Sequence, residues 1–159
     1  MSNLIESVAD HLNSLDLRFQ MTRDGLGIDI CFRGENTTYE ARIAVLDGLL
    51  SIRSASILLL PCERRAVAVA LVNRINAERL RWGAFWVDPH VGDLIFELAS
   101  PVADELAVEQ VAASVAAIGA IDVFFPAFAK VAWAGCSDAE ALQSTSRAAP
   151  TAAEDLELD

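Results

Sequence analysis

The hydrophobic period of the chain changes near residue 16. From Ser2 to Leu15, apolar residues recur every three or four positions, which predicts an amphipathic helix. From Leu17 to about Ser54, apolar and polar residues alternate, as in the run Ile28-Asp29-Ile30-Cys31-Phe32. A period of two is typical of strands that bury one face and expose the other.

Turn residues set the register of four antiparallel strands in this region. Asp24-Gly25 and Asp47-Gly48 are dipeptides that favour two-residue type I′ turns, and Glu35-Asn36 fits the turn between them. A slip of one residue in any strand would move its apolar side chains to the other face. The three turns pair Phe19 with Ile30, Phe32 with Tyr39 and Ile43 with Ile52, all on one face.

The second half predicts a helix, a hairpin and a long final helix. Pro61 suits the start of the first of these helices, whose inner stripe is Val67, Leu71 and Ile75. Residues 82–88 and 93–100 predict the hairpin. The last helix runs from about Glu105 to Ala134 and is apolar on several sides, and Pro126 is expected to kink or split it. The predicted fold is α+β, an antiparallel sheet of five to six strands flanked by helices, in the order α-ββββ-α-ββ-α.

Two runs carry a family resemblance, LVNRINAERLRWGAFWVDPHVGDLIFEL (residues 71–98) and VFFPAFAKVAWAG (residues 123–135). The matching features are the Asn73/Asn76 pair, Gly83-x-Phe85, Asp88 before a turn, and Pro126 in the last helix. With this order of elements, residues 15–135 resemble the YbjN family of bacterial sensory transduction regulators. The resemblance implies a fold like that of type III secretion chaperones and a dimeric, partner-binding domain without known catalysis. The last hairpin departs from the family's usual Asp-Gly turn, because it reads Pro89-His90-Val91-Gly92-Asp93 here.

The composition limits the extent of the domain and the kinds of partner that it can bind. The net charge is −11, which disfavours direct binding to nucleic acid because phosphate backbones repel an acidic chain. We expect one domain over residues 1–136 and a flexible acidic tail over residues 137–159, which hold six acids and one base. Charges interrupt every apolar run before it reaches the length of a membrane span, so no membrane partner is expected. Three widely spaced cysteines and no signal-peptide core favour reduced thiols in the cytoplasm.

The candidate catalytic and metal-binding residues have simpler structural explanations. Asp88, His90 and Asp93 fall in one turn and are a candidate metal site, but Asp, Pro and Gly are ordinary turn residues. Cys62 begins a helix beside Glu63, which opposes a reactive thiolate. We expect no cofactor, no metal and no enzymatic activity, since no convergent polar constellation is present.

Aromatic and apolar residues on predicted outer surfaces indicate protein binding. The last hairpin places Trp86 opposite Ile95 on the outer face, and we expect this pair, with Trp82, to bind a protein client. The last helix is expected to form a homodimer contact through Val111, Val115, Ile118, Phe124 and Phe128. Two alternatives stay open. In one, the tail or the first helix covers Trp86/Ile95 and Phe124 within one chain. In the other, the space between helices and sheet holds a small molecule, as in a sensor.

Overall fold

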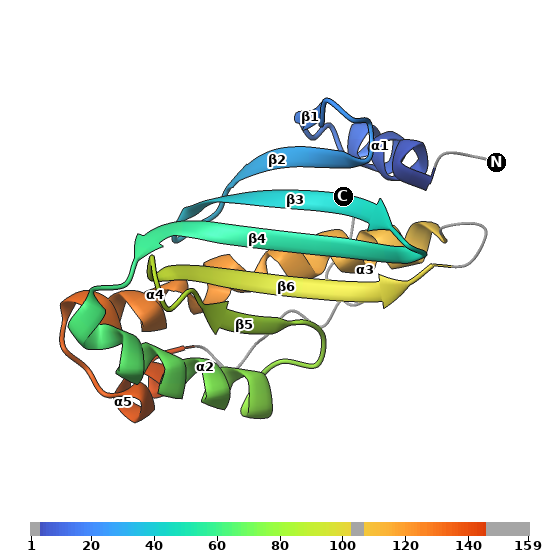
Figure 1. Ribbon diagram of the computed structural model, residues 1–159. Helices are drawn as coiled ribbons and strands as arrows, with labels where there is room; N and C mark the ends of the chain where they lie inside the picture. Colours follow the sequence, from blue (N-terminus) through green and yellow to red (C-terminus); the bar gives the residue numbers. More distant parts are fainter. Residues whose placement is uncertain (1–3, 103–106, 146–159) are drawn as a thin grey trace.

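The computed structural model describes residues 4–102 and 107–145. These residues form a six-stranded antiparallel sheet with the strand order β1-β2-β3-β4-β6-β5 (Figure 1). The expected α+β class is therefore confirmed. The strands are β1 (Phe19–Met21), β2 (Gly27–Arg33), β3 (Thr38–Leu46), β4 (Leu49–Leu59), β5 (Ala84–Val87) and β6 (Asp93–Pro101).

The strand registers agree with those predicted from turn chemistry. Asp47 and Gly48 both have positive φ angles, 51° and 75°, as a type I′ turn requires. The structure pairs Phe19 with Ile30, Phe32 with Tyr39, Ile43 with Ile52 and Phe85 with Phe96.

Helices cover one face of the sheet and leave the other open. Helix α1 (Leu4–Ser14), helix α3 (Val108–Ile118) and helix α4 (Ala120–Trp133) lie against the inner face (Figure 1). Helix α2 (Arg65–Glu78), preceded by the short 3-10 helix η1 (Cys62–Arg64), packs beside the edge strand β5. The inner side chains of the strands alternate with outer ones, so burial follows the sequence pattern closely. We call the uncovered side the open face.

The long final helix breaks at Gly119 and not at Pro126. Pro126 lies inside α4, where it has no N–H to donate to the carbonyl of Asp122 four residues earlier. The side-chain amide of Asn36 donates to that carbonyl instead, at 3.2 Å. The helix therefore continues through Pro126, because a residue from the β2–β3 turn supplies the missing hydrogen bond.

Contrary to the expectation that charges interrupt every apolar run, the stretch from Val108 to Trp133 is long and apolar enough to cross a membrane, by length and composition alone. Helix α4 packs its apolar side against the sheet. The ring of Phe85 meets Phe124 edge to face and Phe128 at a tilt, with 5.8 and 5.6 Å between ring centroids. Core helices of globular domains are commonly this apolar, and packing against the sheet accounts for the composition here.

A fifth helix corrects the expected domain boundary at residue 136. Helix α5 (Asp138–Gln143) packs against α2 and α4, and it buries Ala141 and Leu142 in the core. Its start is a capping box. The side chain of Ser137 accepts a hydrogen bond from the backbone N–H of Glu140, and the carboxylate of Glu140 accepts one from the backbone N–H of Ser137. Residues 137–145 thus belong to the domain. The rest of the expected tail, residues 146–159, lies outside the described residues.

Candidate functional site

A row of charged side chains crosses the middle of the open face. The register aligns Asp29, Arg42, Arg53 and Glu97 on four neighbouring strands. Arg42 donates two hydrogen bonds to the carboxylate of Asp29, at 2.7 and 2.9 Å, and these bonds hold the pKa of Asp29 below its usual value. Arg53 lies 3.6 Å from Glu97. The two arginines are thus each neutralised by one acid, and the row carries no net charge.

A shallow depression lies beside this row, lined by Glu40, Ala41, Arg42, Arg53 and Ala55. It is open to solvent over most of its rim. A small molecule there would keep much of its surface in water, whereas typical ligand pockets bury most of theirs. The depression is therefore better suited to binding the broad surface of a protein than to binding a small metabolite.

An apolar surface occupies the end of the open face where β4 meets the β5–β6 hairpin. We call it the apolar corner and define it by Ala55, Ile57 and Leu59 of β4, Trp86 of β5, Ile95 of β6 and Val91 of the hairpin loop. Ile57 is 73% exposed, Leu59 59% and Val91 54%. The register of β4 and β6 shifts between Ala55 and Leu59, so this end of β4 is irregular. Side chains this large and this exposed, grouped on one surface, are typical of interaction sites.

Trp86 and Ile95 lie opposite each other on the outer face, as the hairpin register predicts. Ile95 is only 2% exposed and lies outside the main core cluster, so outer-face neighbours cover it. Trp86 is half-buried, and the guanidinium carbon of Arg53 lies 5.1 Å from the centre of its ring. The indole N–H of Trp86 is buried and finds no partner among the described residues. Trp86 can contact a partner, whereas Ile95 is too buried to do so and packs beside Trp86 on the neighbouring strand.

The hairpin loop that carries Val91 is held in place from two sides. Arg65 donates to the carbonyl oxygens of Pro89, His90 and Val91 at 2.8–3.2 Å. Asp88 accepts hydrogen bonds from the backbone N–H groups of Val91 and His90, and these bonds lower its pKa. Asp88 thus caps the turn, as the sequence analysis predicts for an ordinary turn residue. Of the residues described, no three His, Cys, Asp or Glu side chains are grouped to hold a metal ion.

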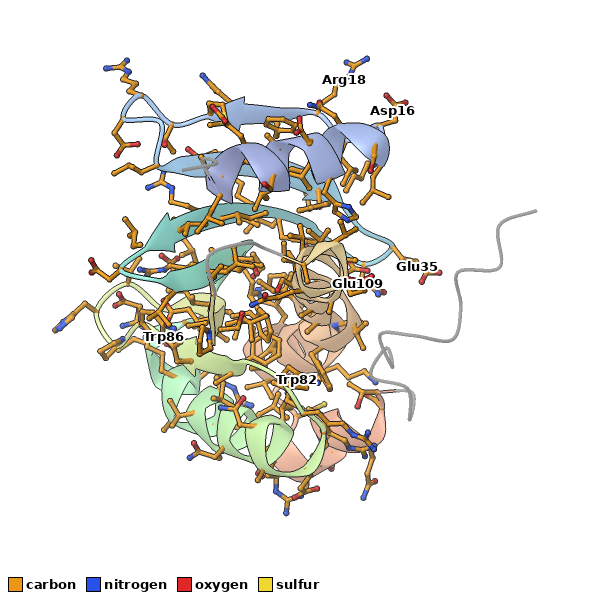
Figure 2. The ribbon with its side chains drawn as sticks, turned by 90° about the vertical axis from the view of Figure 1, so that its right-hand side faces the viewer. Asp16, Arg18, Glu35, Trp82, Trp86 and Glu109 are labelled. Atoms are coloured by element: carbon orange, nitrogen blue, oxygen red, sulfur yellow. The ribbon has the colours of Figure 1, made fainter. Side chains whose placement is uncertain are left out.

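Trp82 lies apart from the apolar corner. It belongs to the loop between α2 and β5 and is 70% exposed. Figure 2 shows Trp86 on the open face and Trp82 nearer the middle of the view. Beside this loop, the side chain of Asn76 makes two hydrogen bonds to the backbone of Phe85, at 2.8 and 2.9 Å. Asn76 therefore pairs with the edge strand, while Asn73 is exposed.

Comparison with known proteins identifies the family. The YbjN family model, described as a putative bacterial sensory transduction regulator, matches residues 4–130. The chain belongs to the YbjN family. A solved structure with a similar fold is that of YbjN, a putative transcription regulator from E. coli, with a TM-score of 0.55 and 15% sequence identity. The similarity covers 69% of this chain and 78% of that one. No curated protein matches the sequence.

The residues expected at a dimer contact lie mainly inside this YbjN domain. Val111, Ile118, Phe124 and Phe128 are at most 2% exposed and belong to the monomer's own core. Val115 is partly buried against the same core. Four of the five side chains thus offer no surface to a second copy, because the sheet already covers them. The sequence alone could not separate a helix buried by its own sheet from one buried by a partner.

Sequence reasoning missed Ile57 and Leu59 as surface residues of the YbjN domain. The run from Ile57 to Leu60 reads as a continuous apolar segment, which resembles a strand buried on both faces. The apolar and polar residues of β4 reverse their order at Ser54, because Ser54 and Ser56 point inward and Ala55 and Ile57 outward; only the even-numbered register that begins at Leu50 continues. Extending that register to the end of the strand places Ile57 and Leu59 on the open face.

Proposed function

We propose that this YbjN-family protein is a non-catalytic regulatory adaptor that binds another protein through the apolar corner. The observation that carries the proposal is the exposure of Ile57 and Leu59 on a sheet face that none of the helices in residues 4–102 and 107–145 covers. Full burial of two such side chains by a partner would contribute roughly 3–6 kcal/mol before the costs of association. Association costs about 4–15 kcal/mol, so these two side chains would supply part of the binding free energy and the surrounding surface the rest.

Two further features support a protein as the occupant. Arg65 and Asp88 fix the loop that carries Val91, so little ordering entropy is lost when a partner binds there. Trp86, with Arg53 against its ring, extends the apolar corner towards the charged row. An apolar centre beside paired charges is the usual anatomy of a protein interface.

The experiment compares two double substitutions on the open face. Ile57→Ser with Leu59→Ser removes the apolar corner, whereas Leu46→Ser with Leu49→Ser changes two exposed leucines, 50% and 41% exposed, at the other end of β4. The full-length proteins are used to capture partners from the native host. We expect one captured protein to be lost with the first pair and kept with the second. Equal capture by both variants would contradict the proposal.

Self-association is the rival use of the same surface. Light scattering of the wild-type protein over a range of concentrations distinguishes it from client binding. A dimer that the Ile57→Ser/Leu59→Ser pair converts to a monomer would assign the apolar corner to a second copy. A mass that is unchanged by both pairs leaves the corner to a different protein.

A further inference from the structure

Strand β5 carries Trp86 of the apolar corner and pairs with another strand on one side only. It is the last strand in the sheet order and consists of four residues, Ala84–Val87. The outer edge of such a strand leaves every second residue without a backbone partner, and short edge strands are among the first elements to open locally. The position of Trp86 therefore depends on what lies along the outer edge of β5.

The side chain of Asn76 takes the place of a neighbouring strand at this edge. Its oxygen accepts a hydrogen bond from the backbone N–H of Phe85 at 2.8 Å, and its amide nitrogen donates to the backbone carbonyl of Phe85 at 2.9 Å. A residue of an antiparallel strand would make the same two bonds. A side-chain amide can do so because it carries a donor and an acceptor side by side. Asn76 thus closes the edge of the sheet at Phe85.

The residue that Asn76 holds is the immediate neighbour of Trp86 in the strand. Phe85 points inward, where its ring meets that of Phe96 at 5.2 Å between centroids, whereas Trp86 points to the open face. Adjacent residues of a strand are only about 3.3 Å apart. Fixing the backbone of Phe85 therefore also fixes the Trp86 ring, against which the guanidinium group of Arg53 lies.

Helix α2 holds the hairpin at both ends. Arg65 in its first turn binds the carbonyl oxygens of the hairpin loop, and Asn76 in its last turn binds Phe85. These two residues are separated by about 16 Å along the helix and by about 20° around it, so they share one face. The hairpin spans a similar length, about 13 Å, from Phe85 to Pro89. Helix α2 therefore lies along the edge of β5 as a support for the apolar corner (Figure 1).

We propose that Asn76 is a positioning residue for the apolar corner, which acts through β5 by keeping Trp86 where a partner meets it. This inference rests on the proposed function, because it names the residue that prepares the same surface for binding. When the two hydrogen bonds of Asn76 are lost, β5 separates from α2 more often. Only the molecules with β5 in place bind the partner, so the apparent dissociation constant rises as their fraction falls.

Hydrogen exchange in the full-length protein tests whether Asn76 fixes β5. In Asn76→Ala, the backbone N–H of Trp86, which Asn76 does not bind, should exchange roughly ten-fold faster than in the wild type, because two hydrogen bonds no longer oppose local opening. Asn73→Ala is the matched control, since Asn73 is an exposed asparagine one turn earlier on the same helix. Its Trp86 N–H should exchange at the wild-type rate. Equal exchange in Asn76→Ala and the wild type would overturn the proposal.

Affinity for the protein captured through the apolar corner tests whether this positioning serves binding. We expect its dissociation constant to be about ten-fold higher for Asn76→Ala and unchanged for Asn73→Ala. Val8→Ala is a second control, because it removes buried side-chain atoms from α1, which packs against α3, β2 and β3. It should lower the stability of the protein and leave the affinity unchanged. Equal losses of affinity in Val8→Ala and Asn76→Ala would overturn the proposal, since a general loss of stability would then explain both.

The results separate this inference from the proposed function. If Ile57→Ser with Leu59→Ser abolishes capture but Asn76→Ala binds with wild-type affinity, the positioning role is wrong and the proposed function stands. If the Ile57→Ser/Leu59→Ser pair does not change capture, the proposed function fails, and Asn76 serves the fold alone. Circular dichroism confirms that each variant is folded. Should Asn76→Ala not fold, Asn76→Ser replaces it in both experiments, because a hydroxyl group can make one of the two hydrogen bonds at a time.

Discussion

At the scale of single residues, Asp122 joins two distant segments of the chain, although the sequence did not single it out. Its carboxylate accepts hydrogen bonds from the backbone N–H groups of Glu35, Asn36 and Thr37, at 2.8–2.9 Å. A Cβ at Gly34 would overlap this carboxylate, so glycine is required there. Asp122 thereby fixes the β2–β3 turn to the first turn of α4, across 85 or more residues of sequence.

Removal of this carboxylate should destabilise the protein. In Asp122→Ala, three backbone donors lose a charged acceptor, and we expect the free energy of unfolding to fall by about 3 kcal/mol. Urea denaturation measures the change. Glu109→Ala, which removes an exposed carboxylate from α3, is the matched control and should stay within about 0.5 kcal/mol of the wild type. A similar small change in both variants would mean that water replaces Asp122 at the turn.

At the scale of elements, the sequence predicted the strands far better than the last helices. Each strand pairing depended on local turn residues, such as Asp47 and Gly48, whose positive φ angles the structure confirms. The position of the helix break depended on a distant residue, because Asn36 satisfies the carbonyl that Pro126 leaves free. Local chemistry can be deduced from a sequence, whereas a hydrogen bond between residues so far apart requires the fold.

Helix α5 illustrates the same limit. Residues 137–145 have an acidic, alanine-rich composition that resembles a solvated extension. The capping pair Ser137 and Glu140 was present in the sequence as a helix-start signal, and Leu142 marked the buried side. What the sequence did not reveal was the surface of α2 and α4 that receives this helix.

The capping box gives α5 a specific dependence on pH. Hydrogen bonds from the backbone N–H and the hydroxyl of Ser137 lower the pKa of Glu140 from its ordinary value of 4.5. A carboxyl whose pKa is lower in the folded state stabilises the protein above pH 4.5, and this contribution is lost as the pH falls below that value. The urea midpoint of the wild type should therefore fall more steeply below pH 4.5 than that of Glu140→Gln.

Comparison with this variant isolates one group, because Asp24, Asp29 and Asp88 also have lowered pKa values and titrate in both proteins. At pH 7 the wild type should be the more stable of the two. Parallel curves from pH 7 to pH 3 would show that protonation of Glu140 does not weaken the cap.

At the scale of the whole molecule, the apolar side chains of the core beneath the sheet contrast with exposed ones, of which Ile57 and Leu59 share the open face. Phe124, once expected at a dimer contact, meets Phe85 edge to face with 5.8 Å between ring centroids and is 2% exposed. Ile57 is 73% exposed. One chain thus buries Phe124 and Phe128 of α4 by itself, whereas Trp133 at the end of the same helix is 67% exposed.

This contrast predicts that one substitution to alanine lowers the free energy of unfolding strongly and that another hardly changes it. Phe124→Ala should lower the free energy of unfolding by about 3–5 kcal/mol, because it leaves a cavity in the core. Ile57→Ala should stay within about 0.5 kcal/mol of the wild type, as expected for a surface position. Ile52→Ala, at a 1% exposed position on the same strand, is the control and should cost about 2–5 kcal/mol. Urea denaturation with light scattering on the same samples separates stability from subunit number. If Phe124→Ala remained as stable as the wild type but changed the mass of the particle, the last helix would be a subunit contact after all, and the assignment of Phe124 to the monomer's core would be wrong.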